Sequence, residues 1–166
     1  MIELLNGRGQ LGIAMQQRIA EYSFNTDVSI LHAWEFVDKS EATQMAQFDK
    51  FRSCLAKAHG IPLFVSTLSR GSTPYVRWKV AAESETLATG GSIIRLPCII
   101  GKGICANLKA GIVEPFGSIE LVSLKHAVEE VLCTASKIGS PKVYSVSGEM
   151  VSAKIVDCLI AFGKNG

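Results

Sequence analysis

The feature that most constrains this chain is a glycine-rich turn that directly follows a short apolar segment at its start. The turn reads Asn6-Gly7-Arg8-Gly9-Gln10-Leu11-Gly12, and Met1–Leu5 before it has the composition of a short buried strand. Glycines at this spacing suit a tight strand-to-helix turn, where bare backbone N–H groups can meet a pyrophosphate. The turn therefore predicts a strand–turn–helix unit that binds a dinucleotide, although a glycine turn without a ligand has the same pattern.

A second motif, Tyr75-Val76-Arg77-Trp78-Lys79, follows the apolar segment Ile61–Thr67 and a short polar loop. Tyr75 and Lys79 are four residues apart, so they share one face if this segment is a helix. A lysine ammonium close to a phenol favours the phenolate, which predicts a lowered pKa for Tyr75 and a role in proton transfer. A tyrosine and a lysine at this spacing also occur on many helices without any function.

Apolar runs alternate with segments of helical periodicity along the whole chain. Strands are expected at Met1–Leu5, Val28–Trp34, Ile61–Thr67, Ser92–Leu96, Ile119–Val122 and Lys142–Val146. Helices are expected at Gln10–Tyr22, Ser40–His59, Tyr75–Thr89, Ile104–Ala110, Lys125–Ser136 and Ser152–Phe162. This alternation predicts an α/β protein with a doubly wound, mostly parallel sheet.

Composition narrows the functional classes. The 166 residues suffice for one domain with a core, with 48% hydrophobic and 19% charged residues. A net charge of +2 without a basic block gives no indication of nucleic-acid binding. No apolar run is long enough for a membrane span, and the start lacks a basic signal-peptide region, so a cytoplasmic protein with reduced cysteines is expected. No cluster with metal-ligand spacing is present in the sequence, so no metal is expected.

The residues of these motifs resemble those of the short-chain dehydrogenase/reductase superfamily, and most closely those of its extended branch of nucleotide-sugar epimerases and dehydratases. Pro74-Tyr75-Val76-Arg77-Trp78-Lys79-Val80-Ala81-Ala82-Glu83 is similar to P-Y-x-x-S-K-x-x-A-E of that family. Gly9-Gln10-Leu11-Gly12 is similar to the turn of deoxysugar 4-keto reductases of dTDP-rhamnose synthesis. Further matches are Arg95-x-Pro97-x-x-x-Gly101-x-Gly103, the segment 119–128, and Val143-Tyr144-Ser145-Val146-Ser147-Gly148.

The resemblance implies a role for each matching residue. Tyr75 would be the general acid/base, Lys79 would hold the nicotinamide ribose, and Thr67 would hydrogen-bond the reacting sugar oxygen. NAD or NADP would be the cofactor and a nucleotide sugar the substrate. The residues that would contact the cofactor are Gly7, Gly9, Gln10, Leu11, Gly12, Ala33, Lys79 and Pro97.

Three residues depart from the family pattern. Asn6 stands where the family has its first glycine, and Asn tolerates left-handed backbone better than most residues. Trp34 replaces a small residue at a strand end, where it is expected to crowd the nicotinamide side. Trp78 replaces the usual serine of the Tyr-x-x-x-Lys motif. His32, two residues before Trp34, is expected to be a packed core or rim histidine.

The chain is also shorter than the resemblance requires. The glycine-turn helix leads directly into Val28–Trp34, which matches the fourth strand of the family, so the second and third strands have no sequence. We therefore expect a minimal Rossmann-type sheet of about five strands, with Val28–Trp34 beside Met1–Leu5 and then Ile61–Thr67 and Ser92–Leu96. One domain is expected over residues 1–166, with 1–103 as the core and 104–166 as a small substrate-lobe remnant and closing helix.

The missing strands have two consequences. Strand 1 becomes an edge that invites pairing, so a homodimer or a partner subunit is expected. The acidic residue that would bind the adenosine ribose is lost, and Asp27 does not replace it because it precedes the fourth-strand match. Two functions remain open at this point: a nicotinamide-dependent nucleotide-sugar enzyme, or a non-catalytic relative that binds a nucleotide or serves as a scaffold.

Overall fold

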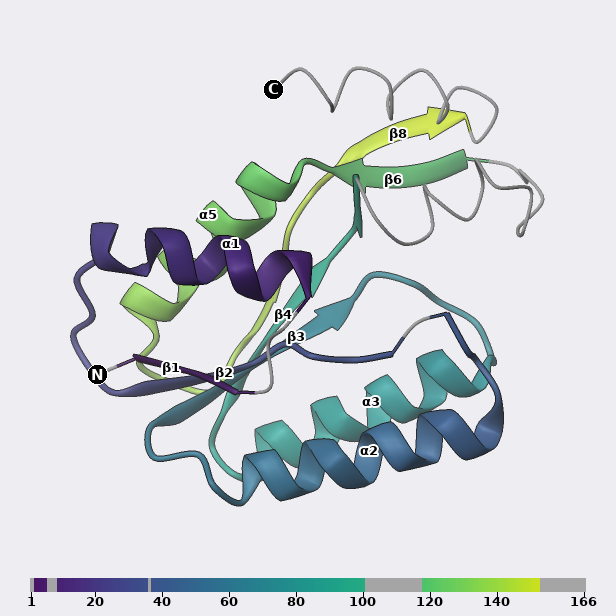
Figure 1. Cartoon of the computed structure of the whole chain (residues 1–166), viewed down its shortest axis with the longest axis horizontal. Coiled ribbons are helices and arrows are strands. Elements are labelled where there is room, and N and C mark those ends of the chain that lie inside the picture. Colours follow the sequence, from purple (N-terminus) through teal and green to yellow (C-terminus); the bar gives the residue numbers. More distant parts are fainter. Residues whose placement is uncertain (1, 6–8, 36, 101–117, 153–166) are drawn as a thin grey trace.

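A computed structural model describes residues 2–5, 9–35, 37–100 and 118–152 of the chain (Figure 1). Its strands are β1 (Ile2–Leu5), β2 (Val28–Leu31), β3 (Ile61–Thr67), β4 (Ser92–Leu96), β5 (Cys98–Ile99), β6 (Ser118–Val122), β7 (Val143–Ser145) and β8 (Glu149–Ser152). Its helices are α1 (Gln10–Arg18), a 3-10 turn at Ile19–Glu21, α2 (Glu41–Leu55), α3 (Pro74–Ala88) and α5 (Leu124–Lys137).

The main sheet has five parallel strands in the order β1-β2-β3-β4-β7. Ile2 pairs with Val28, and Val28 in turn pairs with Ile61, so β2 lies between β1 and β3. This order confirms the predicted topology, including the position of β1 at an edge. The strand that follows the glycine-turn helix, β2, is therefore the direct neighbour of β1.

Two helical layers cover the sheet (Figure 1). On one face, α1 and α5 pack over a core that includes Met15, Ile30, Leu63 and Val131. On the other face, α2 and α3 pack over Leu31 and Phe64, with Phe48, Phe51, Leu55 and Ala82 from the helices. The fold is therefore doubly wound, as predicted.

The first two crossovers of the main sheet differ in hand. The units β1–α1–β2 and β2–α2–β3 step across the sheet in the same direction, but α1 and α2 lie on opposite faces. The two crossovers therefore have opposite hands, and one of them is the left-handed form that is rare in parallel sheets. This arrangement fits the match of Val28–Trp34 to the fourth strand of the resembled family, because α1 then leads directly to a strand that it would not otherwise precede.

Local sequence sets the helix boundaries. Ser40, Thr73 and Ser123 are N-caps whose hydroxyl groups accept from Thr43 N, Val76 N and His126 N. Pro74 occupies the first turn of α3, where its missing N–H costs nothing. Past the end of α3, Gly90 has a φ of 79°, a conformation that suits glycine.

A second, smaller sheet has the order β5-β6-β8, with β6 parallel to β5 and antiparallel to β8. The sequence did not predict β5 or β8, because both are short and lack a clear apolar alternation. Ser152, expected to open a helix, is the last residue of β8. The rest of that helix and the helix expected at Ile104–Ala110 fall outside the described residues. β7 and α5, by contrast, belong to the main sheet and its packing layer.

Gly60 allows the close approach of two backbone segments at the start of β3. A Cβ atom there would lie 2.3 Å from the carbonyl carbon and oxygen of Asp27 and 2.6 Å from the nitrogen of Val28. We expect Gly60→Ala to lower the free energy of unfolding by about 3 kcal/mol, because backbone atoms cannot yield as side chains do. Gly139→Ala is the control, since its Cβ would meet nothing within 4 Å. Equal urea midpoints for the two variants would contradict this prediction.

Candidate active site

A crevice is expected where the loops after β1 and β2 lead to helices on opposite faces of the sheet. Gly9 is the N-cap of α1 at this edge and is exposed, whereas Leu11 and Gly12 are buried and Gln10 is half-buried. Leu11 packs into the core beneath α1. Ala33 lies exposed just after β2, and Gly7 lies outside the described residues.

Thr67 and Tyr75 come together at the carboxyl end of β3. Thr67 is the last residue of the strand, and its Oγ1 accepts from Ser69 N and donates to Ser69 Oγ, each at 3.0 Å. Tyr75, in the first turn of α3, lies beside the Thr67 hydroxyl, which acts to lower the pKa of the phenol. Burial nevertheless raises the pKa of Tyr75 to about 12, and Cys98 adds to the rise. The lowered pKa expected from sequence is therefore not found, because desolvation outweighs the neighbouring groups.

Lys79 lies one turn further along α3 and is only 6% exposed. Its Nζ donates to the carbonyl oxygen of Val65 at 3.1 Å. The ammonium lies 5.2 to 5.7 Å from the ring centroids of Phe64, Trp34 and Tyr75. Burial lowers the pKa of Lys79 to about 7, although Glu83 acts in the opposite direction.

Glu83 continues the same face of α3, and its carboxylate is committed to another partner. Arg95 on β4 donates to it twice, from Nε at 3.0 Å and from Nη2 at 2.6 Å. The Glu83 side chain is 7% exposed and that of Arg95 is 38% exposed. Because this bidentate pair already uses the carboxylate, Glu83 cannot fully compensate a charge on Lys79.

The two tryptophans face the α2 layer. Trp34 contacts the rings of Phe51 and Phe64, and its Nε1 donates to Gln44 Oε1 at 2.8 Å. Trp78 lies 5.0 Å from the ring of Phe48, and its Nε1 donates to Glu41. The Trp34 ring is part of the packing between the sheet and α2 and lies beside the Lys79 ammonium, so its crowding of the nicotinamide side stays a prediction.

Gln44 is a buried organiser that the sequence analysis missed. It is fully buried, and its amide donates to the carbonyl oxygens of Glu35 and Asp38 while it accepts from Trp34. Gln44 thus fixes the segment that follows β2. The sequence indicates this burial through the position of Gln44, four residues before Phe48 on the same buried stripe of α2.

Two further polar groups are buried near the site. Both ring nitrogens of His32, which follows β2 directly, and the hydroxyl of Ser66 on β3 make no hydrogen bond within the described part of the chain. Burial lowers the pKa of His32, a contact with the backbone of Ile30 acts in the opposite direction, and the charge of Lys79 lowers it further, so the net shift is downward and the imidazole is neutral at pH 7. Buried polar groups of this kind usually have a partner, so they indicate a place where a polar ligand can bind.

Pro97, the last predicted cofactor residue, is buried after β4 and faces the second sheet. A Cβ atom added to Gly148 would lie 2.9 Å from Pro97 Cγ and 2.5 Å from the carbonyl oxygen of Leu121. Pro97 therefore packs where the chain passes from the main sheet to β5. Thr67, Tyr75 and Lys79 are thus close together, while Pro97 lies at the border between the sheets.

Two other features are absent from the described ranges, a metal centre and a membrane-spanning helix. Among those residues, no group of three or more histidine, cysteine or acidic side chains is arranged to hold a metal ion. None of the helices there is both long and apolar enough to cross a membrane.

Solved structures of other proteins have the same fold as this chain. RMD from Pseudomonas aeruginosa complexed with NADPH matches 98% of this chain and 83% of its own, with 15% sequence identity and a TM-score of 0.69. A hypothetical dTDP-4-dehydrorhamnose reductase from Sulfolobus tokodaii matches 99% of this chain and 82% of its own, with 16% identity and a TM-score of 0.67. This chain has the Rossmann-type fold of such enzymes.

A UDP-N-acetylglucosamine 4-epimerase from Bacillus cereus has the same fold, with 13% identity, coverage of 99% of this chain and 85% of its own, and a TM-score of 0.60. No family model matches the sequence. No curated protein matches it either. The resemblance drawn from the motifs is therefore confirmed at the level of the fold, which is conserved here at very low identity.

Proposed function

We propose that this protein binds NAD or NADP and acts as a reductase, epimerase or dehydratase on a nucleotide sugar, with Tyr75 as the general acid/base. The observation that carries the proposal is the meeting of Thr67, Tyr75 and Lys79 at the carboxyl end of β3, where ligands bind in such sheets. The solved structures named above include an NADPH complex and two nucleotide-sugar enzymes. Surface-polysaccharide synthesis in the cytoplasm is the setting we propose.

The protonation of the site favours reduction over oxidation. A phenol with a pKa of about 12 is protonated at pH 7, so Tyr75 already holds the proton that a reduction needs, whereas oxidation would require its phenolate, which is scarce at this pH. A bound nicotinamide dinucleotide would supply the hydride. Tyr75 would give its proton to the sugar oxygen as the carbonyl carbon is reduced, and the phenolate would take a proton back from solvent. Thr67 would hold that oxygen, and Lys79 would stabilise the phenolate.

The residues present fit the nicotinamide end of a dinucleotide better than its adenosine end. His32 and Ser66 offer buried polar atoms without a partner among the described residues, and Gly9 begins a helix at the same edge. At the other end, β1 has no further parallel strand beside it in the described sheet, so the strand that carries the ribose-binding acid in such folds is missing.

A second function is favoured by the same site. Tyr75 is held as a neutral phenol, and Lys79 already donates to Val65 and lies among aromatic rings. A non-catalytic relative that binds a nucleotide, or that serves as a partner subunit through the open edge of β1, would have these properties. The two functions differ in whether Tyr75 supports turnover.

A titration with NADH and NADPH, followed by the fluorescence of Trp34 and Trp78, tests the cofactor proposal. We expect a dissociation constant of roughly 100 µM or weaker, because the adenosine half finds few partners. Lys79→Ala should weaken binding, since it removes a ribose contact, whereas Tyr75→Phe should leave it nearly unchanged. His32→Leu should also weaken binding if its ring nitrogens contact the ligand.

His126→Leu is the matched control for that series, because His126 lies on α5 with an exposed side chain. Sub-micromolar binding would show that an adenosine site exists after all. The absence of any binding at millimolar dinucleotide would contradict the cofactor proposal.

A further inference from the structure

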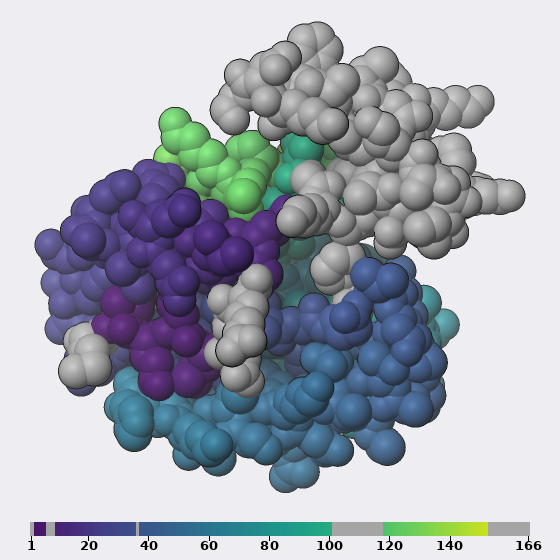
Figure 2. Space-filling view, viewed as in Figure 1, coloured from purple at the N-terminus to yellow at the C-terminus, as the bar shows by residue number. Residues whose placement is uncertain are grey.

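The outer edge of β1 and the adjoining flank of α2 form one continuous open surface. Within the described residues, β1 pairs only with β2, so its other side presents unpaired backbone groups. Below this edge lies a cavity of about 380 Å³ lined by Leu5 and by Asp49, Lys50, Ser53, Cys54 and Lys57. Figure 2 shows the purple atoms of β1 and the blue atoms of α2 on the same face of the molecule.

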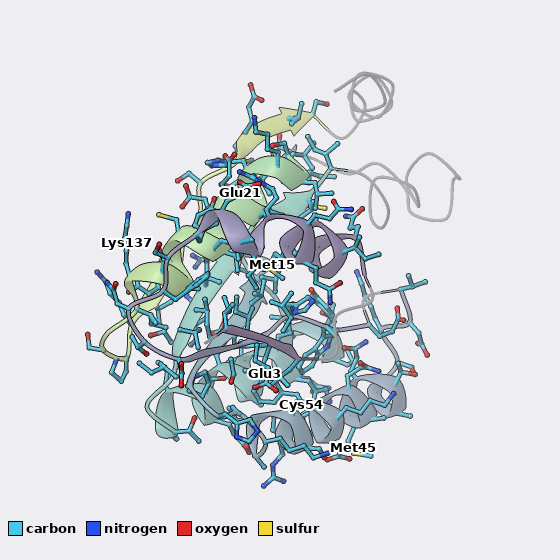
Figure 3. All side chains as sticks on the ribbon, turned by 60° about the vertical axis from the view of Figure 1, so that its left-hand side comes forward. Glu3, Met15, Glu21, Met45, Cys54 and Lys137 are labelled. Carbon is cyan, nitrogen blue, oxygen red and sulfur yellow. The ribbon has the colours of Figure 1, made fainter. Side chains whose placement is uncertain are left out.

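The cavity lies on the side of the sheet that α2 and α3 cover. Leu5 packs against the cluster on that face, and Glu3 points to the same side because side chains alternate along a strand. Figure 3 shows Glu3 on β1 and Cys54 on α2 at this open side. Only part of this surface is apolar, so the occupant must match charges as well as shape.

The charges on α2 are arranged to match a second copy of themselves. Asp49 and Lys57 are eight residues apart, and Ser53 is midway between them. Lys57 lies in the turn directly after α2, where its N–H donates to the carbonyl oxygen of Cys54 at 3.0 Å and keeps it close to the end of the helix. An antiparallel copy of α2 centred on Ser53 would therefore place Asp49 of each chain opposite Lys57 of the other, twice by symmetry.

We propose that this surface is an isologous dimer interface, in which β1 pairs antiparallel with β1 of a second copy and the two α2 helices lie antiparallel across the axis. The small side chain of Ser53 at the centre allows the helices to approach. The same two-fold axis relates both pairs of elements, so β1 and α2 contribute together. The sheet then continues from one chain into the next, which removes the open edge.

Charge reversal tests this arrangement. We expect the wild-type protein to form a concentration-dependent dimer in sedimentation velocity. Asp49→Lys and Lys57→Asp should each weaken the dimer roughly tenfold or more, because each variant brings two pairs of like charges together. The double variant Asp49→Lys/Lys57→Asp should restore the dimer. Position 49 of each chain would then carry a lysine opposite an aspartate at position 57 of the other chain, so opposite charges face each other again.

Lys137→Asp is the control, because Lys137 is an exposed residue of α5 on the opposite face. Hydrogen exchange gives a second measurement: amides of Ile2–Leu5 should exchange faster in the single variants than in the wild type and the double variant. A protein that stays monomeric at all concentrations would overturn the proposal. Dimers that are unaffected by either single charge reversal would overturn it as well.

Discussion

Replacing Lys79 by methionine is expected to stabilise the protein at pH 7 and to remove most of the pH dependence of its stability between pH 7 and 10. Lys79 is nearly fully buried, and its burial lowers its pKa from 10.5 to about 7. One pKa unit corresponds to about 1.4 kcal/mol, so the desolvation of this ammonium costs roughly 5 kcal/mol. The lost hydrogen bond to Val65 returns about 1–3 kcal/mol of this, which leaves a net gain of about 2 kcal/mol or more.

The sign of the pH dependence follows from proton binding. Between about pH 7 and 10.5 the unfolded chain holds the proton of Lys79 and the folded protein does not, so unfolding takes up a proton. The free energy of unfolding of the wild type must therefore rise with pH across this window. Tyr75 does not obscure the effect, because its raised pKa acts only above about pH 10, where it lowers stability.

Urea unfolding at a series of pH values measures both effects. Lys125→Met is the matched control, because Lys125 is an exposed residue of α5. We expect the free energy of unfolding of the control to rise with pH as that of the wild type does. The free energy of unfolding of Lys79→Met should change little between pH 7 and 10. A wild-type stability that is constant from pH 7 to 10 would show that the buried lysine keeps its charge at no cost.

Much of the fold was predictable because it is encoded locally. The apolar runs at β1, β3 and β4 are bounded by glycine or proline, and Ser40, Thr73 and Ser123 cap helices close to their expected starts. The order of the sheet followed from the connection of the glycine-turn helix to Val28. The face of the sheet that α1 covers could not be predicted in this way, because two crossovers of the usual hand would have placed α1 and α2 on the same face.

The electrostatics of the site could not be predicted from spacing alone. Tyr75 and Lys79 were expected to favour a phenolate, but the pKa of each depends on burial that only the packed structure shows. The same holds for Trp34, whose orientation depends on the partner supplied by Gln44. The short strands β5 and β8 depend on pairing with β6, which is a contact between distant segments.

Tyr75→Phe is expected to lower the rate of carbonyl reduction by about 10²–10⁴-fold while leaving the fold and dinucleotide binding intact. The phenol is the proton donor in the proposed reaction, and phenylalanine keeps the ring that contacts Lys79 but removes the acid. The assay is the consumption of NADH or NADPH with a dTDP-4-keto sugar as substrate.

Thr67→Val provides a graded comparison, because it removes the hydroxyl beside Tyr75 and leaves the proton donor in place. We expect it to lower the rate less than Tyr75→Phe does. Ser69→Ala is the control, since it changes a hydrogen bond of Thr67 without touching Tyr75. Full turnover by Tyr75→Phe would eliminate Tyr75 as the acid. A wild-type protein that binds dinucleotide but reduces no keto sugar would instead favour the non-catalytic function, in which the neutral phenol and buried lysine stabilise a binding site rather than a reaction.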